Sequence, residues 1–513
     1  MSQHANLDAE FGTIAALIEE FAKQTPQRVA LVDGERELTY GELDALMNRI
    51  AAKLAAEGIG PREAIAVCAA SSLEYVAVFL GALRVGIVVS PLAPSSTPES
   101  LATMVADSGA KLLFLDQTTR ASLAAIDVRK IALDDTAPDT ALSDWVAPAG
   151  SVPPAVAIQP DWVFNIIYSS GTTGTPKGIE QSHQMRWFHV RRPGQDAYGP
   201  EARTMISTPL YSNTTLVCLF PTLANGGTAI LMRKFDARQF LELAQRHAAT
   251  HAMLVPVQYS RIMALPEFDQ YDLSTFKMKF STSAPFSAAL KRDVLQRWPG
   301  GLVEYYGMTE GGGTCILHAH EHPDKLHTVG RPAPNHDIRL VDEAGREVAQ
   351  GEAGEVVGRS GTVMNGYHNQ PGKTREAEWY DADGNRFIRT GDIGRFDAEG
   401  FLTLFDRRKD MIISGGFNVY PSDIEAVLVQ HEDVAEASVV GVASASWGET
   451  PVAFVVAKAG TKPDAEALRE WVNARLGKTQ RLAALRFLDS LPRSAIGKVL
   501  KRELRDTFGE QLA

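Results

Sequence analysis

The chain has 513 residues, of which 45% are apolar and 22% charged, the composition of a globular protein with several domain-sized units. No apolar run reaches the roughly 20 residues that span a bilayer, and a net charge of −11 argues against nucleic-acid or anionic-membrane binding. Three distant cysteines and a polar, acidic N-terminus exclude a disulfide framework and a signal peptide, so we expect a cytoplasmic protein.

The N-terminal part alternates predicted helices and strands. Thr39 and Glu42 have the spacing of a capping box, and apolar residues recur at helical spacing behind it up to Gly58. Strands are predicted at 64–67, 86–91 and 111–115, with a helix at 73–84. This βαβ rhythm predicts a largely parallel sheet covered by helices. Residues 134–160, rich in Ala, Pro and Asp, are expected to form a surface connection.

An apolar, strand-like run at 162–168 leads into the segment 168–178, Tyr-Ser-Ser-Gly-Thr-Thr-Gly-Thr-Pro-Lys-Gly. Its glycines allow backbone N–H groups to approach an anion, and its hydroxyls and lysine add donors, which predicts a loop for the polyphosphate of ATP. The spacing is not that of a Walker loop, because Pro176 and Lys177 stand where Gly-Lys is needed, and no G-x-G-x-x-G follows the strand. Taken alone, the segment fits a surface turn equally well.

Two further segments place related chemistry after predicted strands. Residues 281–286, Ser-Thr-Ser-Ala-Pro-Phe, form a turn of small residues. Residues 304–310, Glu-Tyr-Tyr-Gly-Met-Thr-Glu, combine aromatic faces for adenine with Thr309 for a phosphate and Glu310 for Mg²⁺. The alternative without a function is that Tyr305 and Tyr306 are aromatic residues of the hydrophobic core.

From about residue 330 glycines and short strands dominate, which predicts a β-rich subdomain at about 330–408, with a hairpin at 396–402. Arg389-Thr-Gly-Asp392 places a carboxylate after a tight turn, suited to ribose hydroxyls. The tail 409–513 contains a predicted helix, two strands and a helix, enough for a domain, and ends with Lys498 after a glycine. Taken singly, Asp392 fits a turn cap and Lys498 a solvated charge.

The run His318-Ala-His-Glu-His322 has the i, i+4 histidine spacing of a zinc-protease helix. Ala319 stands where that motif needs its glutamate, and Pro323 disfavours a helix. We therefore expect a solvated loop here.

The motifs, in this order, resemble those of the adenylate-forming superfamily of acyl-CoA synthetases, adenylation domains and firefly luciferase, over residues 14–508. The segments that carry the resemblance are 168–178, Tyr306-Gly-Met-Thr-Glu310, Thr390-Gly-Asp392, Asp406-Arg-Arg-Lys-Asp410, Gly415-Gly-Phe-Asn-Val-Tyr-Pro421 and 492–498. The resemblance implies an α/β fold: a large N-terminal domain, 1–408, of βαβ sheet subdomains plus the β-rich subdomain, and a small, mobile α+β C-terminal domain, 409–513.

The resemblance also implies two half-reactions, in which a carboxylate attacks MgATP to give acyl-AMP and pyrophosphate and the thiol of CoA then displaces AMP. Lys498 would bridge the two anions, with Thr309 and Glu310 as further catalytic groups and Glu310 as the Mg²⁺ ligand. Tyr306 would stack on adenine opposite Ala284 and Pro285. Asp392 and Arg407 would hold the ribose, Lys409 would lie at a hinge, and Gly415 and Gly416 would lie at the CoA tunnel. The other implied cofactor-binding residues are Ser169, Ser170, Gly171, Thr172, Thr173, Gly174, Lys177, Ser283, Glu304, Tyr305, Gly307 and Met308.

Comparison within the superfamily limits which acid and which acceptor we expect. The region 209–216 lacks the aspartate of amino-acid-activating domains, and no carrier domain follows Lys498, so the resemblance favours a simple carboxylic acid, aromatic or fatty, and free CoA. Ser212 replaces a common histidine, and Tyr305 replaces the glycine of many 4-coumarate-type ligases, which argues against direct transfer of coumarate specificity. The expected acyl pocket consists of Ser212, Thr214, Cys218 and Tyr305. Loading of a carrier protein and a catalytically silent binding protein remain alternatives, and a monomer or homodimer is expected.

Overall fold

The computed structural model describes residues 7, 9–134, 139–169, 176–191, 198–407, 410–414, 417–444, 447–494 and 497–509. The chain divides into two compact units, one of Met1–Ile338 with Gly358–Ile388 and one of Arg339–Val357 with Arg389–Ala513. The boundary predicted at 408/409 for a mobile domain stays a prediction. None of the helices in the described ranges is long and apolar enough to cross a bilayer.

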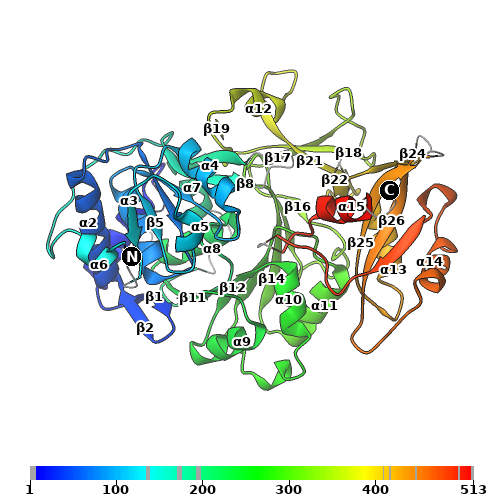
Figure 1. The fold of residues 1–513 in the computed structure, drawn as a ribbon, viewed down its shortest axis with the longest axis horizontal. Helices are drawn as coiled ribbons and strands as arrows, with labels where there is room; N and C mark the ends of the chain where they lie inside the picture. The colour runs from blue at the N-terminus through cyan, green and yellow to red at the C-terminus, as the bar shows by residue number, and fades with distance from the viewer. Residues whose placement is uncertain are drawn as a thin grey trace. The chain divides into compact units, whose positions relative to one another are not determined.

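The first unit contains two mainly parallel sheets (Figure 1). The eight-stranded sheet has the order β19 (Gly366–Tyr367), β9 (Lys177–Ser182), β8 (Val163–Ser169), β4 (Val88–Pro91), β3 (Ala64–Cys68), β5 (Leu113–Leu115), β6 (Lys130–Ala132) and β7 (Thr140–Ala141). Strands β8, β4, β3, β5, β6 and β7 are parallel, while β9 is antiparallel to both β8 and β19. The βαβ rhythm predicted for the N-terminal part is confirmed.

The nine-stranded sheet has the order β16 (Arg331–Pro332), β15 (Cys315–His318), β14 (Gly301–Tyr306), β13 (Met278–Ser281), β12 (His251–Leu254), β10 (Arg203–Ile206), β11 (Thr228–Leu231), β1 (Val29–Asp33) and β2 (Arg36–Thr39). The six strands from β14 to β1 are parallel, and β15, β16 and β2 are antiparallel additions at the two edges. Parallel sheets covered by helices are buried on both faces, which explains the nearly continuous apolar strands.

The helices of the first unit are α1 (Ile14–Gln24), α2 (Tyr40–Ala56), α3 (Leu73–Arg84), α4 (Pro98–Ser108), α5 (Arg120–Leu123), α6 (Leu142–Trp145), α7 (His183–Val190), α8 (Asn213–Ala224), α9 (Ala237–Arg246), α10 (Pro256–Met263), α11 (Ala288–Arg297) and α12 (Pro371–Glu376). The capping box at the start of α2 is confirmed, because Thr39 and Glu42 exchange both hydrogen bonds. Helix α2 buries Leu43, Met47 and Ile50 completely, each stabilising the fold by about 1.5–3 kcal/mol.

The surface connection expected at 134–160 is in part wrong. It contains β7 and α6, and α6 buries Leu142 and Trp145 in the main apolar core. The Trp145 ring packs edge-on against Phe114 of β5 at 5.3 Å between centroids. A tryptophan buries a large apolar area, so this one residue fixes to the core a segment whose composition is typical of a loop.

The second unit contains a sheet of order β24 (Phe417–Val419), β23 (Ile412–Ser414), β26 (Gly448–Ala457) and β25 (Val434–Ser444), with β27 (Ala484–Phe487) beside β26. Helices α13 (Pro421–Leu428) and α14 (Ala465–Asn473) pack on it around Ile424, Leu428 and Leu468, and α15 (Lys501–Gly509) follows. The predicted order of helix, strand, strand and helix is therefore confirmed.

A fourth sheet, of order β17 (Asp337–Val341), β18 (Gly354–Arg359), β21 (Arg386–Phe396) and β20 (Glu378–Tyr380) with β22 (Leu402–Arg407) beside β21, contributes residues to both units. Strands β21 and β22 pair antiparallel from Asp392↔Arg407 to Phe396↔Leu402. This pairing confirms the predicted hairpin and the β-rich character of the region.

Candidate active site

The two ends of the predicted phosphate loop are held in register by a β-hairpin. Strand β8 ends at Ser169 and β9 begins at Lys177, and these two residues are direct partners, as are Tyr168 and Gly178. Ser170, Gly171, Thr172, Thr173 and Gly174 lie outside the described residues. Since β8 is parallel to β4, the loop leaves the carboxyl edge of its sheet, where ligands bind in open α/β folds.

The other predicted segments leave the carboxyl edge of the nine-stranded sheet. Residues 207–212 follow β10, residues 282–286 follow β13, and residues 307–310 follow β14. Strands β13 and β14 are parallel neighbours, with Ser281 opposite Glu304. Segments far apart in the sequence therefore emerge along one edge of one sheet.

Glu310 and Thr309 connect this edge to the other sheet. Gln181 of β9 donates to the Thr309 carbonyl at 2.7 Å, and the Met364 N–H donates to the Glu310 carbonyl at 2.8 Å. The Tyr367 hydroxyl of β19 donates to Glu310 Oε1 at 2.8 Å. The backbone and the carboxylate of this segment are thus fixed independently.

Tyr367 also reaches the phosphate-loop lysine. Lys177 Nζ lies 5.3 Å from the centroid of the Tyr367 ring, within cation–π range. Burial, together with the neighbouring Glu310, raises the pKa of Tyr367 above its ordinary value, so the phenol stays a neutral donor. Tyr367 was not identified from the sequence, and it links the predicted anion-binding lysine to the predicted metal ligand.

A buried network of polar side chains orients Gln181. The Arg186 guanidinium donates to Asn165 Oδ1 at 3.1 and 3.0 Å and also to Gln181 Oε1, and all three side chains are almost completely buried. Because Arg186 occupies the amide oxygen of Gln181, the amide NH₂ group must face Thr309. The network therefore determines which way Gln181 points.

Three glycines after Glu310 pack too closely to carry side chains. A Cβ on Gly311 would lie 1.7 Å from the Thr362 carbonyl oxygen, one on Gly312 would lie 2.8 Å from the Gly358 oxygen, and one on Gly313 would lie 2.9 Å from Ile338 Cδ1. Gly311 and Gly312 also have φ angles of +76° and +93°. Only glycine meets both conditions.

Thr214, one of the residues expected to form the acyl pocket, contacts the predicted nucleotide-binding residue Ser283. Thr214 Oγ1 and Ser283 Oγ lie 2.6 Å apart, and Ser283 has a φ of +80°, a left-handed conformation that costs a non-glycine residue about 1 kcal/mol or more. The Tyr305 ring stacks on Phe280 at 5.9 Å between centroids, with the ring planes inclined by 28°. Cys218 is fully buried, where it accepts a hydrogen bond from a tyrosine hydroxyl and burial raises the pKa of its thiol to about 12.

The remaining predicted nucleotide contacts in this unit differ in exposure. Tyr305, Tyr306, Met308, Thr309, Glu310, Ser283 and Ala284 are partly exposed, and Gly307 and Pro285 are exposed. Ser212 is buried at the N-cap of α8 without a side-chain cap bond. Their roles stay predictions.

Glu304 has a structural partner. Its carboxylate is buried and forms an ion pair with Lys291, whose Nζ also donates to the Leu326 and Thr328 carbonyls at 2.8 and 3.0 Å. Burial raises the pKa of Glu304, and the ion pair opposes that rise. The side chain therefore anchors α11 to β14, whatever its part in nucleotide binding.

Removing the lysine should leave a buried, unpaired carboxylate. We expect Lys291→Ala to lower the free energy of unfolding by about 3 kcal/mol, measured by urea denaturation. Arg292→Ala, at the exposed neighbouring position on α11, should change it by less than about 0.5 kcal/mol. Equal stabilities for the two variants would show that the pair is not the anchor.

A second pair joins β9 to the residue after β19. His368 Nδ1 lies 2.6 Å from Glu180 Oε1 and its Nε2 lies 3.0 Å from the Asp107 carbonyl oxygen, so both ring nitrogens face acceptors. The hydrogen bond to Glu180 raises the pKa of His368 above its ordinary value, although partial burial opposes this. A doubly protonated ring satisfies both acceptors.

This pair should make stability depend on pH. A histidine whose folded pKa is raised stabilises fully below its unfolded pKa of about 6.5 and loses that stabilisation as pH rises through the folded pKa. Between about pH 6 and pH 8 we expect the melting temperature of the wild type to fall relative to that of His368→Gln. Parallel melting profiles would contradict the prediction.

In the second unit, Asp392 lies within the irregular strand β21, not after the tight turn expected from the sequence. Its N–H donates to Thr390 Oγ1 at 3.0 Å, and Thr390 in turn donates to the Val356 carbonyl at 2.9 Å. Arg407 of β22 is its backbone partner across the hairpin. Lys409, Gly415 and Gly416 lie outside the described residues.

The backbone of Lys498 is hydrogen-bonded to Ser494. The Ser494 N–H donates to the Lys498 carbonyl at 2.8 Å, and the Lys498 N–H donates to Ser494 Oγ at 3.2 Å. Arg493 donates to the Gly497 carbonyl at 2.7 Å and forms an ion pair with Glu436 at 2.6 Å. These contacts hold the backbone of the lysine independently of its side chain.

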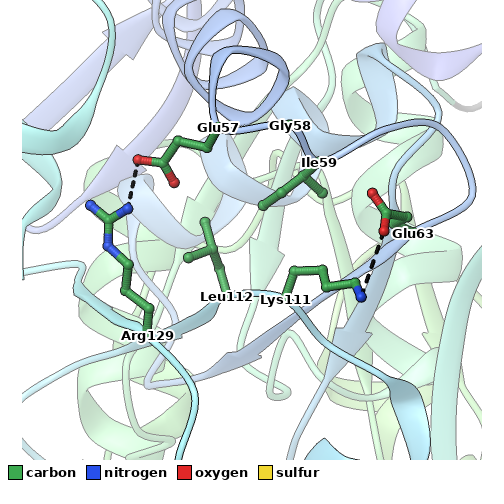
Figure 2. A pocket seen from close by; sticks show the side chains of 7 residues that line it. All are labelled: Glu57, Gly58, Ile59, Glu63, Lys111, Leu112 and Arg129. Carbon is green, nitrogen blue, oxygen red and sulfur yellow. Dashed lines mark hydrogen bonds and ion pairs between the residues drawn. The ribbon is translucent and has the colours of Figure 1, made fainter.

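A hollow of about 390 Å³ lies elsewhere in the first unit, lined by Glu57, Gly58, Ile59, Glu63, Lys111, Leu112 and Arg129 (Figure 2). Glu63, Leu112 and Arg129 directly precede β3, β5 and β6, so the hollow is at the amino edge of the sheet. Its charges pair with one another, Arg129 with Glu57 at 2.8 Å and Lys111 with Glu63 at 3.7 Å. The candidate active site is at the opposite edge.

The family model described as AMP-binding enzyme matches residues 18–368, and the model described as AMP-binding enzyme C-terminal domain matches residues 423–498. A feruloyl-CoA synthase from Amycolatopsis sp is 32% identical over 500 residues, which cover 95% of this chain and 97% of that protein. The fatty acid–[acyl-carrier-protein] ligase ScoC from Streptomyces coeruleorubidus is 32% identical over 506 residues, 95% of each chain. The crystal structure of ATP-bound MatB from Rhodopseudomonas palustris superposes with a TM-score of 0.87 at 28% identity, covering 97% of this chain and 100% of that one.

Proposed function

The chain belongs to the AMP-binding enzyme family, and on that premise we propose that it is an AMP-forming acyl-CoA ligase. The observation that carries the proposal is the convergence of the phosphate-loop hairpin, Tyr367 and Glu310 where two parallel sheets present their carboxyl edges. A carboxylate oxygen attacks the α-phosphorus of ATP, the bond to the β-phosphate oxygen breaks, and pyrophosphate leaves. The sulfur of CoA then attacks the acyl carbonyl carbon and AMP leaves.

The first step brings two anions together, so charge neutralisation and positioning are what the protein must supply. We assign Lys498 to the incoming carboxylate and the α-phosphate, and Lys177 with the loop hydroxyls to the outer phosphates. Mg²⁺, which neutralises phosphate charge when bound, would be held by Glu310, a carboxylate that Tyr367 already orients. Tyr306 would stack on adenine, and Asp392 would hold the ribose.

The second step uses the same site with another nucleophile. We propose that the small domain turns about Lys409, which withdraws Lys498 and brings Gly415 and Gly416 to the CoA tunnel. The acting unit is proposed to be a monomer or a homodimer. Its partners are then small molecules: ATP, CoA and a carboxylic acid.

We propose an aromatic acid as the substrate. Tyr305, assigned to the acid pocket, stacks on Phe280 and so carries a flat aromatic face against which a planar acid can pack. The similarity to a feruloyl-CoA synthase is in line with this choice. The bulk of Tyr305 favours a smaller acid than one that needs glycine at this position.

Pyrophosphate release tests the proposal across benzoic, arylacetic, hydroxycinnamic and fatty acids of short, medium and long chain. We expect at least one aromatic acid to support release, with AMP and an acyl-CoA appearing only when CoA is added. Reactions without acid and with Glu310→Gln provide the background. If no acid supports pyrophosphate release, the ligase assignment is contradicted. If only fatty acids support it, the aromatic preference is contradicted.

A second acceptor is favoured by one finding, the similarity over 95% of the chain to a ligase named for an acyl carrier protein. The alternative function is therefore loading of a carrier-protein thiol. To separate the two acceptors, AMP release is measured with a productive acid and with either CoA or a phosphopantetheinylated carrier protein at equal concentration. The true acceptor should accelerate AMP release more strongly.

A further inference from the structure

The turn after β15 brings three metal-binding side chains together, at a place that the proposed reaction does not use. Residues 318–322 form a turn in which the N–H groups of Glu321 and His322 donate to the His318 carbonyl at 3.0 and 3.1 Å. One ligand atom each from His318, His320 and Glu321 lies within 4.8 Å of the others. We propose that this trio is a binding site for a divalent transition metal ion of the zinc type.

The three ligands come from one short stretch and differ from the pair considered from the sequence. A helix would have paired His318 with His322, whereas the turn pairs His318 with His320 and Glu321. The rings of His318 and His320 are 6.0 Å apart between centroids and inclined by 66°. His320 Nε2 lies 3.7 Å from Glu321 Oε1. An ion with bonds of about 2.0–2.2 Å to nitrogen and oxygen can reach both atoms from a point between them.

The orientation of His320 is fixed by backbone. Its Nδ1 faces the backbone of Leu302, 3.2 Å from the amide nitrogen and 3.1 Å from the carbonyl oxygen, and in the tautomer that donates to this carbonyl the lone pair of Nε2 is available to a metal ion. Metal-binding histidines usually donate their second nitrogen to a carbonyl or carboxylate in this way. The ring also packs on Gly301, where an added Cβ would lie 2.9 Å from His320 Cε1.

His318 is suited to the same task. It is half-buried at the end of β15. Two imidazoles and one carboxylate with a position left open for water suit Zn²⁺ and its neighbours, whereas Mg²⁺ prefers oxygen ligands.

The site is distinct from the Mg²⁺ position proposed at Glu310. Strands β14 and β15 pair Val303 with His318 and Tyr306 with Cys315, so the trio lies three residues, about 10 Å, along the strand from the predicted adenine contact. A metal ion here would join the end of β15 to the turn that follows it, because its three ligands lie within residues 318–321. Its effect should therefore appear first in stability.

The test uses the full chain without a histidine tag, treated with EDTA and dialysed. We expect Zn²⁺ titrated by calorimetry to bind at one equivalent, and Co²⁺ to give a visible absorption band that Mg²⁺ does not displace. His318→Ala, His320→Ala and Glu321→Ala should each weaken binding at least about tenfold. His322→Ala, the matched change on the same turn, should leave affinity within about twofold.

Thermal unfolding gives a second measurement, independent of calorimetry. Saturating Zn²⁺ should raise the melting temperature of the wild type and of His322→Ala, but not that of His320→Ala. Wild-type affinity weaker than about 100 µM overturns the proposal. So does undiminished Zn²⁺ binding by His320→Ala, or a loss with His322→Ala equal to that with His318→Ala.

Discussion

Replacing Lys498 with alanine is expected to reduce adenylate formation by about 10³-fold or more, because the variant loses the cation assigned to two converging anions. Thioester formation from a supplied acyl-AMP should continue, since the assigned role ends when pyrophosphate leaves. Ser494 bonds to the backbone of Lys498 and Arg493 bonds to that of Gly497, so the local backbone should survive the change. Pyrophosphate exchange measures the first half-reaction, and acyl-CoA formed from synthetic acyl-AMP measures the second.

Lys501→Ala is the matched control, a lysine three residues further on that forms an ion pair with Glu425 at 3.0 Å. It should leave both half-reactions nearly unchanged. Equal losses in both half-reactions for Lys498→Ala would contradict the assignment, because they would indicate a damaged domain.

Replacing Glu310 with glutamine is expected to reduce the first half-reaction by about 10²- to 10³-fold and to raise the Mg²⁺ concentration needed for half-maximal rate. Glutamine keeps the shape and removes the charge that is proposed to hold the metal. Tyr367→Phe should produce a smaller effect of about tenfold, because it removes only the hydrogen bond that orients the carboxylate.

Comparing Glu310→Gln with Tyr367→Phe and with a control variant makes the test specific for the metal assignment. Glu347→Gln, an exposed carboxylate paired with Arg339 at 2.7 Å, controls for loss of negative charge. A Mg²⁺ dependence in Glu310→Gln identical to that of the wild type would refute the metal assignment. A loss in Tyr367→Phe as large as that in Glu310→Gln would show that the tyrosine has more than a positioning role.

Local pattern was enough to predict most of the fold. The capping box of Thr39 and Glu42, the strand at 64–67 and the helix at 73–84 match α2, β3 and α3 closely, because each signal lies within one element. The connection at 134–160 was misjudged, because burial of Trp145 depends on Phe114 in a distant strand. Composition alone does not contain that contact.

The site residues were likewise predicted where the signal is local in the sequence. Motifs that follow strands, such as 304–310, were found from their residues, and their position at the end of β14 is confirmed. Tyr367, Gln181 and Arg186 were missed, because none belongs to a dense motif. Tyr367 and Gln181 act on Glu310 and Thr309, which are far away in the chain, and Arg186 acts through Gln181. At 318–322 a solvated loop was predicted, and the structure has a turn there with His320 and Glu321 exposed.

The glycines at 311–313 have a consequence for anyone who wishes to redesign acid specificity. A mutagenesis library that surrounds Glu310 would naturally include them, yet any side chain there meets a carbonyl or an isoleucine at less than 3 Å. Variants at these positions should disappear from a selection for soluble protein before activity is ever sampled. Diversity is better directed to Ser212, Thr214 and Tyr305, where a new side chain changes a wall of the proposed pocket and leaves the backbone in place.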